Sequence, residues 1–401
     1  MPSSVMSLAC RKYLFCLFLL FTQESHSRWS QAAGLHFKKY QASFRQSFEA
    51  SVWGSLNNPK INKTKDLPNL KLLSFELEAY KKKVTAYFHR TQKTPSQNSL
   101  VVIVPGIFAD LNADYALFSM SRLSKKGHDV LTLSNPWSKK IIKAQPLHPP
   151  GDIKNEALSY LQLIEIFLKQ NNKSYKKVSL LGFSYGALLS SAINGLDKVL
   201  NHKINGQSYL ISPPENLLET ILNLDQILDQ EHQRYKKLSL LSLVLIRSNY
   251  LKSKRAEELS LRSREYAAAI AAYRGFQLDL KKLSQTLYLN NSHNSSYYLG
   301  YQKLMSNPSK WRFSNYVDYF ADSNSRIFRD PKVQLSYWLR VAQEHSKTAL
   351  PNILSTHDDF LNHESQWHKY GEQDSLKVLK HGGHMGFVAT TWFEEFLNII
   401  Y

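Results

Sequence analysis

Residues 177–195, KVSLLGFSYGALLSSAING, carry the main evidence for the fold that we predict for this chain. It reads as a short apolar strand at 178–181, the turn GFSYG at 182–186, and a helix that opens at Ala187. A sharp strand–turn–helix of this kind strains the backbone at its serine and exposes the hydroxyl above the sheet. The flanking glycines are needed where two backbones pass close together. The pattern predicts a nucleophile elbow at Ser184, with an ordinary glycine-bounded turn as the alternative.

Strands and helices alternate on both sides of this elbow. Strands are expected at residues 99–104, 128–133, 178–181, 207–211, 350–355 and 375–379. Helices are expected at residues 113–126, 153–170, after the elbow, at 364–371 and at 391–401. Unbroken apolar runs such as SLVVIV are typical of parallel strands covered on both faces, whereas residues 72–78 and 83–90 read as an antiparallel pair. The pattern predicts an α/β fold with a mostly parallel, doubly wound sheet, whose functional site lies at the carboxyl ends of the strands.

The first residues of the chain have the pattern of a signal peptide. An Arg-Lys pair precedes an apolar run that is too short to span a bilayer comfortably, and small residues then stand at plausible cleavage positions before Arg28. Both cysteines, Cys10 and Cys16, lie inside this leader, so a mature chain would have no disulfide and no thiol nucleophile. We therefore expect export to a periplasm or to the outside, with an uncleaved N-terminal anchor as the alternative.

The order of elements predicts the domain organisation. Residues 1–27 are the leader, 28–69 an N-terminal helical and linker segment, 70–212 the first part of the α/β core, 213–348 a helical cap insertion, and 349–401 the second part of the core. Within the N-terminal segment, aromatic residues at helical spacing predict a packing helix over 36–50, with a helix on a membrane surface as the alternative. Residues 57–69 read as a polar linker.

The chain is strongly basic, with 51 Lys and Arg against 32 Asp and Glu in 401 residues and a formal net charge of +19. The excess is spread along the sequence, and no long basic tail stands out. It suits either peripheral contact with an acidic membrane or envelope surface or simple solubility. Because no nucleic-acid module and no interleaved aromatic and basic pattern is present, we expect no nucleic-acid partner.

A serine hydroxyl is a weak nucleophile, so it needs a histidine to take its proton and a carboxylate to orient that histidine. With this kind of elbow, the acid and then the histidine follow the serine in loops after late strands. His384, in HGGHMGF, is preferred because glycines stand before and after it, and His381 is its rival. In THDDFL, Asp358 is preferred as the acid from its spacing to two apolar residues, with Asp359 as the alternative.

Acyl transfer also needs two backbone N–H donors for the oxyanion. Tyr185, directly after the serine, and Ile107, after the Pro-Gly turn that ends the strand at 99–104, are expected to supply them. His357 and His363 flank the acid loop but lack the spacing of metal ligands, and the mature chain has no cysteine ligand. No metal and no cofactor are expected.

Four features together resemble the α/β-hydrolase superfamily: GFSYG, the Pro-Gly turn after VVIV, THDDFL and above all GGHMGF. They are most similar to its carboxylesterase and acylglycerol-lipase branch related to the YheT-type hydrolases, in which a GGH-x-GF loop carries the catalytic histidine and a helical cap interrupts the sheet. Three positions depart from that pattern: Pro105 replaces a usual His-Gly, Ala187 a frequent Gly, and Asp359 a common Pro. The resemblance covers residues 70–401 and implies an α/β-hydrolase fold that hydrolyses esters of acyl substrates.

Two functional hypotheses follow. In the first, the protein is a serine hydrolase for a small-molecule or lipid ester, with Ser184 as nucleophile, His384 as general base and acid, and Asp358 as the orienting carboxylate. In the second, an exported protein of the same fold has lost catalysis and binds lipid or envelope polymer. Since every required position holds a usable residue, the enzyme is favoured. The sequence leaves open the substrate's chain length and headgroup, transfer to an acceptor other than water, and the oligomeric state.

Overall fold

A computed structural model describes residues 36–42, 47–92, 98–235, 280–286, 306, 312–321, 327–345, 350–367 and 375–401, apart from 38, 172, 201, 284 and 363. The predicted leader and much of the predicted cap lie outside these residues. Within them, no helix combines the length and the apolar character that a membrane span requires.

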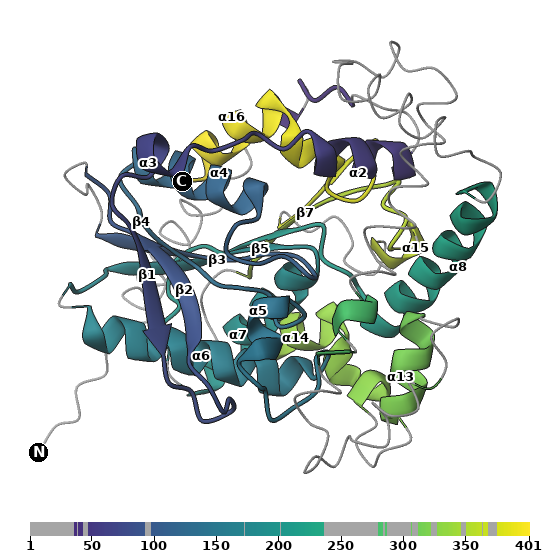
Figure 1. Ribbon diagram of the computed structural model, residues 1–401. Coiled ribbons are helices and arrows are strands. Elements are labelled where there is room, and N and C mark those ends of the chain that lie inside the picture. Colours follow the sequence, from purple (N-terminus) through teal and green to yellow (C-terminus); the bar gives the residue numbers. More distant parts are fainter. Residues whose placement is uncertain are drawn as a thin grey trace, which may run out of the picture.

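An eight-stranded sheet forms the centre of the molecule, in the order β1-β2-β4-β3-β5-β6-β7-β8 (Figure 1). The strands are β1 (Leu70–Phe75), β2 (Val84–His89), β3 (Ser99–Val104), β4 (Asp129–Thr132), β5 (Lys177–Phe183), β6 (Tyr209–Ile211), β7 (Asn352–Thr356) and β8 (Leu376–Leu379). β2 runs antiparallel to β1 and β4, and all the other neighbours are parallel. The predicted class, a mostly parallel α/β sheet, is confirmed.

Helices cover both faces of this sheet, which explains its unbroken apolar strands. One face carries α4 (Asp114–Lys125) and α16 (Thr391–Ile400), and the other carries α6 (Ile153–Gln170), α7 (Tyr185–Leu200) and α14 (Leu335–His345) (Figure 1). Along β3, alternate side chains enter opposite cores: Val101 and Ile103 pack with α4 and α16, while Leu100, Val102 and Val104 pack on the α6 and α7 side. Each of these five side chains is fully or almost fully buried, so the run from Leu100 to Val104 is apolar without alternation.

The other described elements are α2 (Ser47–Leu56), α3 (Lys63–Asp66), α5 (Lys139–Lys143), α8 (Leu217–Tyr235), α13 (Phe313–Ala321), α15 (Glu364–Trp367), and the 3-10 helices η4 (Ile327–Arg329), η5 (Pro331–Val333) and η7 (Gly386–Ala389). Of those within residues 213–348, α8 and α13 lie together at one end of the sheet, whereas α14 packs along α7 (Figure 1). The boundaries of a separate cap stay a prediction.

The expected bounds of the helix in the N-terminal segment are wrong. Residues 39–42 are not helical, and helix α2 occupies Ser47–Leu56, so it continues past residue 50. The aromatic spacing reflects burial on different elements, because Phe37 and Tyr40 pack on Trp392 of α16 while Phe48 packs on Phe360. The expected linker at 57–69 contains the short helix α3, which forms because the Asn62 side chain caps it by accepting a hydrogen bond from a backbone N–H of its first turn.

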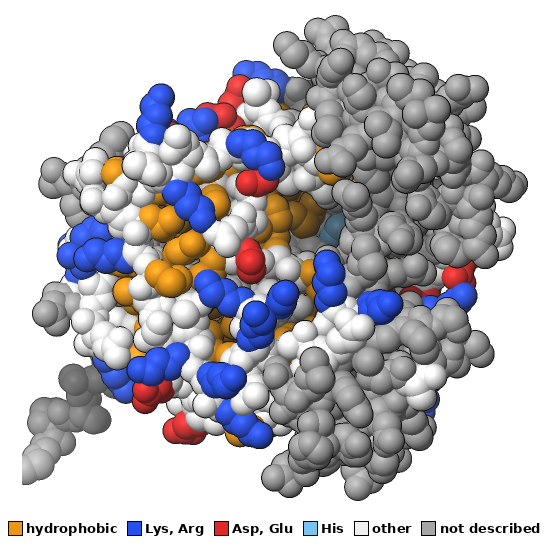
Figure 2. All heavy atoms as spheres, in the orientation of Figure 1, with side chains coloured by type: hydrophobic (Ala, Val, Ile, Leu, Met, Phe, Trp, Pro, Cys, Tyr) orange, Lys and Arg blue, Asp and Glu red, His pale blue; other side chains and the backbone are white. Residues whose placement is uncertain are grey.

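Positive charge is spread over the face of the molecule that Figure 2 shows. Figure 2 shows Lys and Arg side chains scattered over one face, with hydrophobic side chains exposed between them. The net charge of +19 is therefore not gathered into a single patch on this face. Contact with an acidic surface stays a prediction.

Candidate active site

The chain turns from β5 into α7 at Ser184 with strained backbone geometry. Ser184 has a φ of 51°, in the left-handed region that non-glycine residues seldom occupy. A Cβ atom at Gly182 would lie 2.5 Å from the Cα of Ala187, and one at Gly186 would lie 2.2 Å from the carbonyl oxygen of Val104. Both glycines are therefore required by backbones that pass in close contact. The turn has the geometry that the sequence predicts, although the helix begins at Tyr185 instead of Ala187.

His384 lies beside this serine. Its Nε2 atom is 2.7 Å from the Oγ of Ser184, and its Nδ1 atom is 3.0 and 3.1 Å from the two carboxylate oxygens of Asp359. An ionised carboxylate only accepts hydrogen bonds, so the imidazole donates from Nδ1 and leaves Nε2 free to accept the serine proton. The Asp359 side chain is fully buried and that of His384 is 13% exposed. A continuous chain of hydrogen bonds thus links a buried carboxylate to the hydroxyl of the elbow.

The structure corrects the preferred acid, because Asp359 and not Asp358 contacts the imidazole. The Asp358 carboxylate turns the other way and accepts hydrogen bonds from the backbone N–H groups of Gly382, at 3.3 Å, and Gly383, at 2.9 Å. Neighbouring side chains of this turn point in different directions, which the spacing of the sequence does not reveal. His381, the rival histidine, lies 3.8 Å from Asp358, and its side chain is 41% exposed.

The two predicted N–H donors lie at the same cavity as the serine. Ile107 and Tyr185 line it together with Ser184 and His384. The Ile107 turn approaches the elbow closely, since a Cβ at Gly106 would be 3.2 Å from the Cβ of Ser184. Among the described residues, neither the Ile107 nor the Tyr185 backbone N–H has a hydrogen-bond acceptor. Their role as donors to an oxyanion stays a prediction.

The cavity itself has a volume of about 400 Å³ and a largely apolar wall. Hydrophobic side chains in this wall include those of Leu217, Ile221, Leu224, Phe360, Met385 and Val388. These six come from α8, from the acid loop and from the histidine loop, so three segments far apart in the sequence contribute to the wall. Such a cavity suits an apolar group held next to the serine.

Two polar residues beside the site were missed by the sequence analysis. The Tyr185 hydroxyl donates a hydrogen bond to the carboxylate of Glu156 on α6, which also accepts the Gly151 N–H at 2.8 Å. Complete burial raises the pKa of Glu156 to about 8, although both of these hydrogen bonds act to lower it. An acidic residue on the apolar face of α6 was the available signal. Ser51, whose Oγ accepts the His384 backbone N–H at 2.6 Å, had no such signal.

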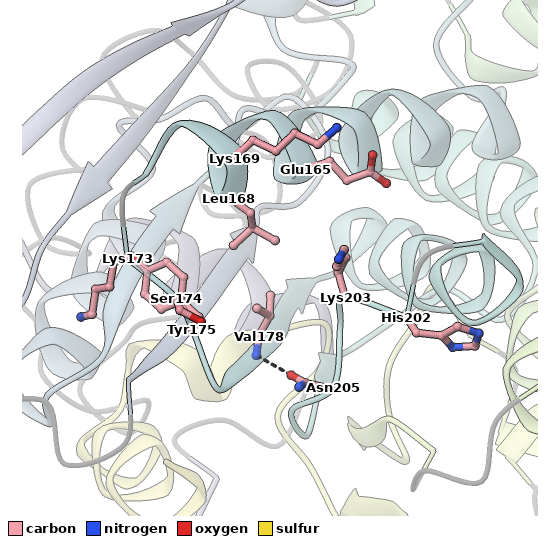
Figure 3. Close-up of a pocket in the computed structure, with 10 residues that line it drawn as sticks. All are labelled: Glu165, Leu168, Lys169, Lys173, Ser174, Tyr175, Val178, His202, Lys203 and Asn205. Carbon is pink, nitrogen blue, oxygen red and sulfur yellow. Dashed lines mark hydrogen bonds between the residues drawn. The ribbon is translucent and has the colours of Figure 1, made fainter.

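A second hollow, of about 460 Å³, lies at the opposite end of β5. Figure 3 shows lysine side chains around it from α6 and from the loops before β5 and β6, including Lys169, Lys173 and Lys203. At its floor the Val178 N–H donates to the Asn205 side chain at 2.9 Å. No Ser–His–carboxylate chain occurs among the residues that line it.

Metal ligands are not assembled in the part of the chain that the structure describes. No group of three or more His, Cys, Asp or Glu side chains there could hold a metal ion. His357 is exposed, and His363 lies outside the described residues.

Comparison with known proteins finds weak structural similarity. No family model matches the chain, and none of the curated proteins does. Among solved structures, an esterase of Pyrococcus furiosus matches 85% of this chain and 94% of its own at 14% identity and a TM-score of 0.44. A serine hydrolase of Cycloclasticus zankles matches 82% and 95% at 10% identity and 0.44, and an acylaminoacyl peptidase of Pyrococcus horikoshii matches 83% and 42% at 11% identity and 0.40.

Similarity at this level carries no argument about activity, so the fold is assigned from the molecule's own features. These are the mostly parallel sheet covered by helices on both faces, the strained serine turn between β5 and α7, and the chain order serine, acid, histidine. The similarity to YheT-type hydrolases in particular stays a prediction. The α/β-hydrolase fold that the sequence motifs imply is confirmed.

Proposed function

We propose that the protein is a serine hydrolase that cleaves a carboxylic ester of an acyl or lipid-like substrate. One observation carries the proposal: the hydrogen bonds from Asp359 through His384 to Ser184 end at a strained turn that faces an apolar cavity. A buried carboxylate that holds an imidazole 2.7 Å from a serine hydroxyl supplies what a weak nucleophile needs.

In the first step, Ser184 Oγ bonds to the ester carbonyl carbon while its proton passes to His384 Nε2. The π electrons of the carbonyl move onto its oxygen, which accepts hydrogen bonds from the Ile107 and Tyr185 N–H groups. Asp359 stabilises the imidazolium through the Nδ1 hydrogen bond. The C=O bond then re-forms, the bond to the alcohol oxygen breaks, and the alcohol leaves with the proton from Nε2.

In the second step, water takes the place of the alcohol. His384 Nε2 accepts a proton from this water as the water oxygen bonds to the acyl carbon. When the tetrahedral intermediate collapses, the bond to Ser184 Oγ breaks and Oγ regains the proton from Nε2. The carboxylic acid leaves and the enzyme returns to its starting state. An alcohol or amine in the place of water would give acyl transfer by the same sequence.

The apolar wall favours a substrate with an apolar acyl group. Burying such a group stabilises its complex by about 25 cal/mol for each Å² removed from water. A cavity of about 400 Å³ sets an upper limit on the part of the substrate that is enclosed. We therefore expect rates on soluble esters to rise with acyl length and then to level off.

A fluorophosphonate probe followed by peptide mapping tests the proposal. We expect labelling of Ser184 in the wild type, none at this position in Ser184→Ala, and strongly reduced labelling in His384→Ala. Ser191→Ala is the matched control, because this buried serine of α7 donates only to a carbonyl of its own helix, that of Leu188. A well-folded wild type without label would contradict the proposal and favour a protein that binds lipid without hydrolysing it, which co-sedimentation with anionic vesicles would detect.

A further inference from the structure

The loop that carries His384 is held by side chains at three successive backbone N–H groups. Asp358 accepts the N–H of Gly382 and of Gly383, and Ser51 accepts that of His384 itself at 2.6 Å. Gly382 and Gly383 have φ values of 136° and 57°, conformations that ordinary residues rarely adopt. These side-chain hydrogen bonds hold the loop together with the one that the Thr356 hydroxyl donates to the Gly383 carbonyl at 2.8 Å.

Helix α2 lies against this loop in backbone contact on both sides of His384. A Cβ atom at Gly383 would lie 1.9 Å from the carbonyl oxygen of Ser47, and one at Gly386 would lie 2.4 Å from that of Ala50. On the helix, a Cβ at Gly54 would lie 2.7 Å from the Cα of Gly386. Three glycines are therefore placed where the helix and the loop meet, which allows a contact that no other residue type permits.

The chain around α2 is itself anchored to the hydrolase core. The Ser47 hydroxyl donates to the backbone carbonyl of Asp358, next to the acid that holds His384. Before the helix, the His36 ring stacks on Trp392 of α16, and the Trp392 indole N–H donates to the His36 carbonyl at 3.0 Å. These contacts connect α2 to the acid loop and to the last helix of the core.

The end of this segment also borders the cavity. Asn58, which follows α2, lines the cavity together with Ser184 and His384. Its side-chain oxygen is buried and has no hydrogen-bond partner among the described residues. The segment that precedes the sheet thus touches both the histidine loop and the space beside the nucleophile.

We infer that α2 is a clamp on the histidine loop and that Ser51 is a positioning residue for His384. This inference rests on the proposed function, in which His384 moves the proton. The Ser51 hydroxyl accepts a hydrogen bond from the backbone N–H of His384 and donates one to the Ser47 carbonyl at 2.9 Å. It therefore fixes the position of the loop along the helix. Ser51 does not meet the substrate, and its effect passes entirely through His384.

Ser51→Ala tests the positioning role. We expect kcat on a soluble ester to fall between about 10-fold and 100-fold, because a small displacement of a catalytic group costs up to about that factor. KM should change by less than about three-fold, since Ser51 contributes nothing to the cavity wall. Ser51→Thr keeps an acceptor oxygen at the same place and should recover most of the lost kcat.

The matched control is Ser159→Ala in α6. Like Ser51, Ser159 is buried and donates to the carbonyl four residues before it, that of Asn155, at 2.8 Å. It lies on the far side of the sheet from α2, so its replacement should leave kcat unchanged. Equal thermal unfolding midpoints for the two variants would separate loss of position from loss of stability.

Hydrogen exchange of the peptide at 381–387 gives a readout that does not depend on activity. Faster exchange there in Ser51→Ala, and not in Ser159→Ala, supports the clamp. Wild-type kcat and unchanged exchange in Ser51→Ala would overturn it, even when the wild type is labelled at Ser184. A wild type that is not labelled at Ser184 overturns the proposed function and the positioning role with it, whereas the exchange result still decides whether α2 holds the loop.

Discussion

The two hollows at the opposite ends of β5 have similar volumes, about 400 Å³ at its carboxyl end and about 460 Å³ at its amino end, yet they are built differently. At the carboxyl end, the polar groups are buried and linked to one another in a single chain that ends at Ser184. At the amino end, Lys169, Lys173 and Lys203 surround an open hollow, and their charges are not linked to one another (Figure 3).

The hydrogen-bonded links between polar groups, and not the volume, therefore distinguish the reactive site from a surface depression in this protein. The amino end does contain a buried polar network, but its hydrogen bonds connect parts of the protein to one another. Asp129 accepts hydrogen bonds from Lys173 at 2.9 Å, from the Tyr175 hydroxyl at 2.8 Å and from the Thr91 N–H at 2.9 Å. Every one of its partners is used within the protein, whereas the network at the carboxyl end leaves a hydroxyl facing a cavity.

The largest effect should come from Ser184→Ala, which removes the protein's nucleophile in the proposed mechanism. We expect ester hydrolysis to fall by about 10⁴-fold or more. Serine and alanine both carry a Cβ atom and are strained to a similar degree at this left-handed φ, so the unfolding midpoint should stay close to that of the wild type. Steady-state kinetics together with thermal unfolding measure both quantities. Activity within about 10-fold of the wild type would remove the elbow from the mechanism.

Replacement of the two neighbouring aspartates, Asp358 and Asp359, should lower kcat to very different extents. Asp359→Asn replaces the carboxylate that fixes the imidazole tautomer, so kcat should fall by about 10³-fold to 10⁴-fold. Asp358→Asn keeps one acceptor oxygen where the carboxylate offers two, one each to the Gly382 and Gly383 N–H groups, and should cost about 10-fold or less because Asp358 does not contact the imidazole. Comparison of kcat for the two variants checks this order. The reverse order would restore Asp358 as the acid.

Much of the sheet could be predicted because its cause is local. The expected strand at 99–104 is β3, Ser99–Val104, and the expected helix at 153–170 is α6, Ile153–Gln170. A strand that is buried on both faces has an unbroken run of apolar residues. A helix that is buried along one side has apolar residues that recur with the helical period. The helical spacing at 36–50 misleads because residues far along the chain, Trp392 for Phe37 and Tyr40 and Phe360 for Phe48, decide where its aromatic side chains pack.

The site was predictable to the extent that its chemistry leaves a pattern in neighbouring residues. Ser184 and His384 stand between glycines that the backbone requires, so both could be found. The choice between Asp358 and Asp359 depends on the direction of one turn. Ser51 joins the site from a helix that precedes the sheet, and only the packing of α2 on the histidine loop brings it there.

A third prediction concerns the network at the amino end. Asp129→Ala leaves the Lys173 amine and the Thr91 N–H without their acceptor, so the free energy of unfolding should fall by about 3 kcal/mol. kcat per folded molecule should stay within about two-fold of the wild type. Glu344→Ala is the control, since its exposed pair with Arg340 at 3.9 Å should contribute about 0.5 kcal/mol or less. Urea unfolding measures these differences, and a catalytic loss in folded Asp129→Ala would break the separation of the two ends.

Glu156 should make stability depend on pH. Burial raises its pKa from 4.5 to about 8, so between these values the folded protein keeps a proton that the unfolded chain releases. The stabilising contribution is complete below pH 4.5 and is lost as the pH rises toward 8, at up to about 1.4 kcal/mol per pH unit. Unfolding between pH 5 and 8 should therefore show a steeper decline in the wild type than in Glu156→Gln. Parallel curves would mean that Glu156 is ionised in the folded state.

The smallest effect should come from the lysines of the amino-end hollow. Lys169→Gln combined with Lys203→Gln removes two positive charges from the end of β5 that lies away from Ser184, and ions at physiological strength screen such charges over about 8 Å. We expect kcat/KM on an uncharged soluble ester to stay within about two-fold of the wild type, because neither amine contacts the chain from Asp359 to Ser184. Measuring the same ratio at low and high salt separates a field effect, which salt abolishes, from a structural one. A loss of about 10-fold or more at high salt would mean that the two ends of the sheet are coupled, and the contrast between a connected site and an open hollow would then no longer explain where this protein works.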